Sequence, residues 1–149
     1  MSKHMARISW QRQTPGFSLP DYNRDHEWEF PGGVSLEASA AVAYHGHEAR
    51  VDPEQALVAA VSSCHMLTFL AICARKGLVI DRYVDSAVGY LEKNQASRLA
   101  VTHIELSPEI EFAENAPSEA ELKELHEKAH QQCFIANSVR TKISLLRHS

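Results

Sequence analysis

The pattern of hydrophobic and polar positions predicts three strands in the first part of the chain. Residues 5–11 alternate between apolar and polar side chains, as a strand does, whereas residues 14–25 hold prolines and a glycine and favour an irregular loop. Residues 26–31 and 34–44 then predict a hairpin, with its turn at Pro31-Gly32-Gly33.

A long helix is expected after the hairpin. Asp52 suits the N-cap, Pro53 suits the first helical position, and Gln55 can return a hydrogen bond to the cap. The helix is expected to stop at Gly77, because glycine favours the end of a helix. Its residues are apolar on nearly every side, so we expect it at the centre of the fold and covered all round.

The remaining pattern predicts further strands and a second helix. Strands are expected near residues 79–92 and 99–113, a helix from its cap at Ser118 to Cys133, and a last strand over 139–147. The order β-β-β-α-β-β-α-β predicts an α+β fold, with strands packed around a long buried central helix.

Composition limits the classes of function. A length of 149 residues fits a single domain, 1–149, and a net charge of −4 without a basic stripe argues against nucleic-acid binding. The most apolar stretch, residues 56–74, contains two serines, a histidine and a threonine, so it predicts a buried helix and no membrane span. The first residues do not have the pattern of a signal peptide, and we expect a cytoplasmic protein.

The three cysteines are too few for a disulfide scaffold, which in a reducing compartment favours a nucleophile, a redox centre or a metal ligand. Cys64 lies in the middle of the predicted central helix, within Ser62-Ser63-Cys64-His65. It is either a small core residue or a functional thiol. Two serines and a histidine in an otherwise apolar helix need a reason, which favours the functional thiol.

The other two cysteines differ in position. Cys73 lies nine residues after Cys64, on the opposite side of the helix, so the two cannot pair, and core packing is its expected role. Cys133 lies on the apolar stripe of the second helix and points to the same interior as the first helix. It can meet Cys64 if the two helices pack closely, or it is a coincidental core residue.

A zinc site is the rival use of these side chains. His126, His130 and Cys133 share one side of the second helix, and Cys64-His65 could add ligands. The compact spacings of zinc motifs are absent, however, and His45-Gly46-His47 has no partner nearby in the sequence. We therefore expect no metal and no cofactor.

Three segments together are similar to a known family. Residues 52–57 (DPEQAL), Ser63-Cys64-His65 and residues 129–138 (AHQQCFIANS) resemble the OsmC/Ohr family of organic hydroperoxide reductases. The likeness spans most of the chain and includes the order of the elements. It implies an intertwined homodimer with the long helices inside and two active sites at the subunit interface. Its partners would be a small hydroperoxide and an external thiol or dithiol reductant, with no nucleic acid and no membrane.

The resemblance also implies roles for individual residues. Cys64 matches the peroxidatic cysteine, Cys133 the resolving cysteine, and Glu54 the glutamate on the first turn of the central helix. The family's arginine is best matched by Arg24, with Arg50 as the competitor. The family usually has a proline after the resolving cysteine and glycines around the arginine; this chain has Phe134 and lacks those glycines, which indicates a divergent branch.

The chemistry explains why these residue types would be needed. A thiolate attacks a peroxide and a thiol does not, so an arginine beside Cys64 would favour the reactive form, and Glu54 could hold that arginine. The product sulfenic acid condenses with Cys133 to a disulfide, which an external thiol reduces. Leu57, Met66 and Phe134 are expected to form apolar pocket walls. The alternative is a non-catalytic dimer of the same fold that binds an apolar ligand or a metal.

Overall fold

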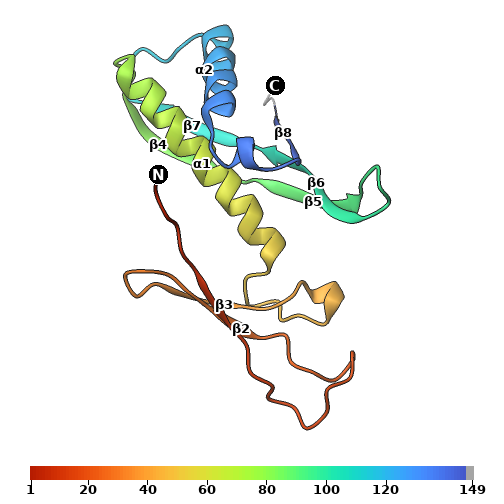
Figure 1. Ribbon diagram of the computed structural model, residues 1–149. Helices are drawn as coiled ribbons and strands as arrows, with labels where there is room; N and C mark the ends of the chain where they lie inside the picture. Colours follow the sequence, from red (N-terminus) through yellow and green to blue (C-terminus); the bar gives the residue numbers. More distant parts are fainter. Residues whose placement is uncertain (147–149) are drawn as a thin grey trace. The chain divides into compact units, whose positions relative to one another are not determined.

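A computed structural model describes residues 1–146 of the chain (Figure 1). The chain divides into two compact units, Met1–Ala56 and a second that begins at Leu57. Each unit is described by itself. The predicted last strand, 139–147, ends at a residue outside the described part of the chain.

The first unit is built on a three-stranded antiparallel sheet of β1 (Arg7–Ser9), β2 (His26–Glu29) and β3 (Ser35–Ala38), in that order. Trp28 of β2 lies between Ile8 of β1 and Leu36 of β3. The predicted hairpin is confirmed, but its second strand ends at Ala38 and does not reach residue 44. A short 3-10 helix, η1 (Val42–Tyr44), replaces the end of the predicted strand.

The helix α1 (Pro53–Arg75) begins and ends as predicted. The backbone N–H of Gln55 donates to Asp52 Oδ1 at 2.8 Å, and the Gln55 side chain accepts from the Asp52 N–H at 3.0 Å. At the other end Gly77 has a φ of 73°, a left-handed conformation in which glycine carries no steric penalty. The capping signals in the sequence therefore placed both ends of α1 correctly.

In the second unit, the described residues up to 146 form five strands in two sheets. They are β4 (Ile80–Asp85), β5 (Val88–Lys93), β6 (Leu99–Leu106), β7 (Pro108–Phe112) and β8 (Lys142–Leu145). The strands β4 and β7 form an antiparallel pair, and the other sheet has the order β5-β6-β8, with β6 and β8 parallel.

Each of the two long predicted strands is broken into two shorter ones. The break follows from a tertiary contact: the Asp85 carboxylate accepts a hydrogen bond from the Ser107 backbone N–H at 2.6 Å. The chain therefore turns at residues 86–87 and at Ser107. As a result β4 and β7 pair in one sheet, whereas β5 and β6 lie in the other. No local pattern of apolar residues signals such a turn.

The helix α2 (Glu119–Gln132) packs on α1 within the second unit. Ser118 and Glu121 form the predicted capping box, and Cys133 is the C-cap. One core cluster joins the two helices, and a second joins α1 to β6. The first consists of Phe69, Ile72, Cys73, Leu125 and Ala129, and the second of Val61, Ile104 and Leu106. Cys73 is thus a core residue, as predicted.

The sheet approaches α1 very closely at Gly89 on β5. A Cβ atom added to this residue would lie 2.5 Å from a methyl group of Val58 on α1, closer than nonbonded carbon atoms can approach. The backbone of β5 and the side of α1 therefore meet at a position that only glycine can occupy without displacing Val58.

One face of α1 is buried and another is exposed. The buried face carries Val61, His65, Phe69, Ile72 and Cys73. The exposed residues gather on the other side and are mostly small, namely Ala59, Ala60, Ser63, Leu67, Ala71 and Ala74. The expected cover on all sides is therefore not complete within one chain. By length and composition alone α1 could also cross a membrane, a test that the core helix of a soluble protein passes as well.

Candidate functional site

The side chains of Cys64 and Cys133 meet in the second unit. Cys64 lies half-buried on α1, and Cys133 lies at the C-cap of α2 with 1% of its surface exposed. The Cys133 thiol is hydrogen-bonded to Cys64, and neither cysteine is in a disulfide. Residues 69 positions apart in the sequence are therefore neighbours, and Cys64 is the more exposed residue of the two.

The turn after α2 encloses the Cys133 sulfur. The backbone N–H of Ala136 donates to Cys133 Sγ at 3.4 Å, and the N–H of Asn137 donates to the Cys133 carbonyl at 3.0 Å. The Ser138 hydroxyl donates to the Phe134 carbonyl at 2.7 Å and closes the 3-10 helix η2 (Ala136–Ser138). The residues after Cys133 thus hold its sulfur in a defined position at the end of α2.

The environment of Cys133 favours its protonated form. Burial is the largest cause and raises the pKa of the Cys133 thiol, and the hydrogen bond with Cys64 raises it further. The N–H of Ala136 lowers this pKa, but by less than burial raises it. At neutral pH Cys133 therefore stays a thiol that can donate a hydrogen bond to Cys64.

A pair of histidines lies beside the cysteines. Nε2 of His65, the residue after Cys64, is 3.0 Å from Nδ1 of His126 on α2, and the planes of the two rings are nearly parallel, with an interplanar angle of 9° and centroids 5.3 Å apart. Phe69 stacks on the His126 ring, at 4.3 Å between centroids. The exposed fractions of His65 and His126 are 1% and 7%. Burial, as the largest cause, lowers the pKa of each imidazole to about 4.

Sequence reasoning missed this pair. It considered His126 only together with His130, as candidate ligands of a rival zinc site, whereas His126 is buried and His130 is exposed. The signal that could have found it is the helical spacing of His126 to Ala129 and Cys133 on one face of α2. Over residues 1–146, no group of three or more His, Cys, Asp or Glu side chains is placed to hold a metal ion.

Ser62 accounts for part of the polar character of the central helix. Its hydroxyl donates to Asp85 Oδ2 at 2.5 Å, and the other carboxylate oxygen of Asp85 accepts from the Ser107 N–H. Thr68 donates back to the Cys64 carbonyl at 2.8 Å. The Ser62–Asp85 contact fixes α1 against the corner between the two sheets of the second unit, whereas the Thr68 bond stays within α1.

Glu54 and Arg24 line one cavity in the first unit. Its volume is about 540 Å³, and most of its wall is apolar or aromatic. The Arg24 guanidinium lies 3.7 Å above the centre of the Tyr22 ring and donates to the carbonyls of Tyr22, at 2.5 Å, and Leu19. The aromatic wall is formed by Trp10, Phe17, Tyr22 and Tyr44.

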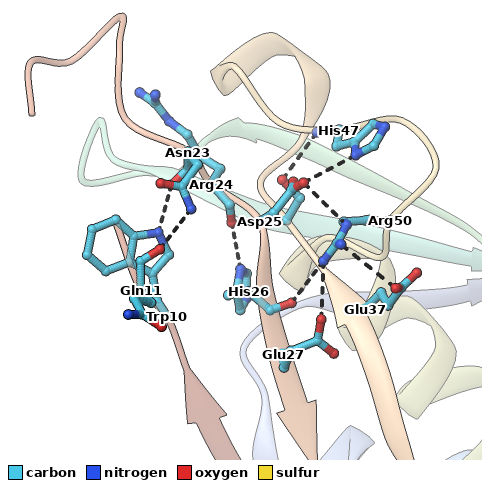
Figure 2. A network of polar contacts seen from close by, with 11 residues as sticks. Trp10, Gln11, Asn23, Arg24, Asp25, His26, Glu27, Glu37, His47 and Arg50 are labelled. Carbon is cyan, nitrogen blue, oxygen red and sulfur yellow. Dashed lines mark hydrogen bonds and ion pairs between the residues drawn. The ribbon is translucent and has the colours of Figure 1, made fainter. Parts of the chain in front are cut away.

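Arg50 serves a different part of the first unit. It forms ion pairs with Asp25 at 3.4 Å, Glu27 at 3.5 Å and Glu37 at 3.8 Å, and Asp25 also contacts His47 (Figure 2). Arg50 thereby ties β2 and β3 to the segment before α1. Of the two candidate arginines, Arg24 shares a cavity with Glu54, whereas Arg50 is neutralised by three carboxylates.

The expected apolar pocket walls lie in three different environments. Leu57 packs against the core cluster of Val61, Met66 is half-buried, and the Phe134 side chain is 81% exposed. The residue that stands where the family usually has proline is therefore at the surface of the chain.

Comparison with known proteins agrees with this fold. The family model described as OsmC-like protein matches residues 46–145. An OsmC-like protein of unknown function from Vibrio cholerae is 42% identical, with a TM-score of 0.93 over 98% of this chain and 99% of that one. No curated protein matches this chain by sequence.

More distant structures share the fold alone. An organic hydroperoxide resistance protein OsmC from Legionella pneumophila is 16% identical, with a TM-score of 0.73 over 99% of this chain and 98% of that one. One from Elizabethkingia anophelis, with thiocyanate bound, is 16% identical with a TM-score of 0.74 over the same shares. The model match and the Vibrio cholerae protein, taken with the order of the elements, establish that the chain belongs to the OsmC-like protein family.

Proposed function

We propose that the protein is a thiol-dependent peroxidase that reduces organic hydroperoxides with Cys64 and Cys133. The observation that carries this proposal is the hydrogen-bonded contact between the two thiols, one half-buried and one buried. Family members titled organic hydroperoxide resistance proteins support the substrate class.

The proposed cycle balances in three steps. The Cys64 thiolate attacks the O–O bond of ROOH, which leaves a sulfenic acid on Cys64 and releases ROH after the alkoxide takes a proton. The Cys133 thiol then displaces hydroxide from the sulfenic acid, so that a disulfide and water form. Two thiol groups of an external reductant return the pair to thiols and leave as a disulfide.

In this proposal the two cysteines have different tasks because their environments differ. Cys64 meets the peroxide, since it is the more exposed residue, and Cys133 stays protonated until the sulfenic acid appears. Arg24 is the proposed cation that favours the Cys64 thiolate, and Glu54 its carboxylate partner. Their shared cavity in the first unit supports Arg24 over Arg50.

We further propose that the protein works as a homodimer, with the whole chain acting as one domain in the cytoplasm. The exposed face of α1, built from alanines, Ser63 and Leu67, supports this arrangement. Small residues let two helices approach closely, and an exposed apolar helix face costs free energy until something covers it. Sedimentation equilibrium tests the dimer; a monomer at micromolar concentration contradicts it.

The catalytic proposal is tested by counting thiols. The reduced protein is mixed anaerobically with one equivalent of cumene hydroperoxide, and free thiols are measured after denaturation. We expect the loss of two of three thiols and retention of Cys73. The Cys64→Ser variant should lose none. Cys73→Ala, which removes the buried third thiol, serves as the matched control and should still lose two.

An unchanged thiol count in the wild-type protein would contradict the proposal. It would favour the second candidate, a binding protein of the same family, for which the aromatic cavity of the first unit is the supporting observation. In that case an apolar fluorescent probe should bind the cavity, and Trp10→Ala should weaken its binding while the thiols stay reduced.

A further inference from the structure

We propose that the hydrogen bond between His65 and His126 is a positioning device that sets the approach of the Cys64 and Cys133 sulfurs. Both histidines are buried, and both lie on the helices that carry the two thiols. This inference rests on the proposed function and adds two positioning residues to it.

The positions of the two histidines allow the pair to influence how the Cys64 and Cys133 sulfurs approach each other. His65 is adjacent to Cys64 on α1, whereas His126 lies seven residues before Cys133 on α2. Seven residues return to nearly the same face of a helix about 10 Å further along its axis. The two helices are therefore joined at two points of α2, and the thiol contact alone would leave α2 free to pivot about its end.

A directional bond adds what the surrounding apolar contacts lack. Phe69, Leu125 and Ala129 pack the same interface, but apolar contacts tolerate small shifts and rotations. An N–H···N bond needs one imidazole as donor and the other as acceptor, with the two nitrogens about 3 Å apart. Because both rings are buried, breaking this bond leaves a polar group without a partner, so the bond selects one arrangement of the helices.

The groups around the pair keep both rings uncharged. Burial disfavours the imidazolium form of each, and the neighbouring His130 acts in the same direction on His65. Asp85 of β4 acts in the opposite direction but is occupied by Ser62 and the Ser107 N–H. Tyr83 of β4 packs against Phe69 with its ring tilted, and it stays a neutral phenol, because burial raises its pKa. At neutral pH the pair therefore persists as two neutral imidazoles.

The histidine pair should affect the closure of the disulfide and not the attack of Cys64 on the peroxide. Attack of Cys64 on a peroxide needs only Cys64 and its immediate surroundings. Disulfide closure needs the Cys133 sulfur within bonding reach, a distance that depends on how α2 lies on α1. Loss of the pair should therefore slow closure, lengthen the life of the sulfenic acid and increase its further oxidation to sulfinic acid.

The first measurement is the equilibrium between the Cys64–Cys133 disulfide and dithiothreitol at pH 7.5, which needs no peroxidase activity. The variants are His126→Phe, which fills the space, the double variant His65→Phe/His126→Phe, and the matched control His130→Gln on the exposed side of α2. We expect the equilibrium constant for disulfide formation to fall about tenfold in His126→Phe, as a misaligned pair costing about 1.4 kcal/mol would produce. His130→Gln should match the wild type.

The second measurement separates positioning from general damage. After one equivalent of cumene hydroperoxide, rapid alkylation and mass spectrometry should show first oxidation of Cys64 at the wild-type rate, with delayed disulfide and added sulfinic acid. A merely structural role would slow both steps alike. Near-UV circular dichroism tests whether each variant is folded. If His126→Phe does not fold, the double variant is measured in its place.

Three results overturn the inference. The first is a folded variant with a disulfide equilibrium within twofold of the wild type. The second is an equal slowing of both steps. The third is failure of both variants to fold, which would assign the pair to folding itself. If wild-type protein forms the disulfide with diamide but not with the hydroperoxide, the peroxidase proposal fails, and the dithiothreitol equilibrium still decides the positioning role.

Discussion

Different forces stabilise the interior of each of the two compact units of the chain. In the first unit the fully buried residues that the structure describes are Ala38 and Ser39, and its order comes from short strands, an aromatic cluster and the ion pairs of Arg50. The second unit has two buried hydrophobic clusters that include residues of α1. Buried apolar area is the main stabilising force in folding, whereas exposed ion pairs contribute little. The second unit is therefore the stable part of the chain, and it is also the part that contains both proposed redox thiols.

The largest expected effect comes from the core of the second unit. Phe69→Ala should lower the free energy of unfolding by about 3–5 kcal/mol, because it removes a fully buried ring and leaves a cavity between α1, α2 and β4. Denaturant titration measures the loss. Leu99→Ala, at an exposed leucine on β6, is the control and should cost below about 1 kcal/mol. An equal cost at both positions would mean that burial does not distinguish the core from the surface of the second unit.

The histidine pair makes the second unit sensitive to acid. His65 and His126 have a pKa of about 4 in the folded protein and 6.5 as the ordinary value, so the unfolded chain binds more protons between these limits. The free energy of unfolding should therefore fall as the pH is lowered from about 6.5 to 4, on the order of a few kcal/mol. Thermal melts across this range measure it. The His65→Phe/His126→Phe variant should show a clearly flatter profile, and an unchanged slope contradicts the assignment.

The ion-pair network of the first unit should matter less. Arg50→Gln removes the charge that joins Asp25, Glu27 and Glu37, and it should cost about 1–2 kcal/mol, more at low salt. Hydrogen exchange should rise in the peptides that cover residues 25–38 and not in α1 beyond residue 57. The control Arg82→Gln breaks an exposed pair with Glu111 in the second unit and should cost well under 1 kcal/mol. Faster exchange throughout the second unit would contradict the conclusion that the Arg50 ion pairs stabilise the first unit alone.

The smallest expected effect is at the surface of the second unit. Ser118→Ala removes the side chain that accepts from the Glu121 N–H and should cost about 1 kcal/mol or less. Urea denaturation measures it, with Ser118→Thr as the conservative control. A loss as large as that from Phe69→Ala would show that the cap, and not the core, dominates the stability of this unit.

Local signals in the sequence were enough to predict the helix ends. Asp52 with Gln55, Ser118 with Glu121, and Gly77 act within one turn of the backbone, so their effect can be recognised without any tertiary structure. The meeting of Cys64 and Cys133 was also within reach, because both cysteines lie on apolar stripes and the family resemblance implies the pairing.

The features that were missed depend on contacts between distant residues. The break of both long strands arises from Asp85 binding the Ser107 backbone, and His126 is buried because His65 lies opposite it. Neither partner can be identified from its own neighbours in the sequence. Arg24 and Glu54, which share a cavity although 30 positions separate them, were named through the family resemblance and not from their own neighbours in the sequence. Sequence patterns thus predicted elements, and tertiary contacts decided which side chains meet.

The close approach at Gly89 limits how the protein could move during the proposed redox cycle. Because the Val58 methyl already occupies the space where a side chain of residue 89 would begin, α1 has a hard stop on the side of β5. The helix that carries Cys64 therefore could not roll toward the sheet if the proposed disulfide formed and opened again. In the proposed cycle, the change in separation between the two sulfurs must then come from the side of Cys133, at the end of α2.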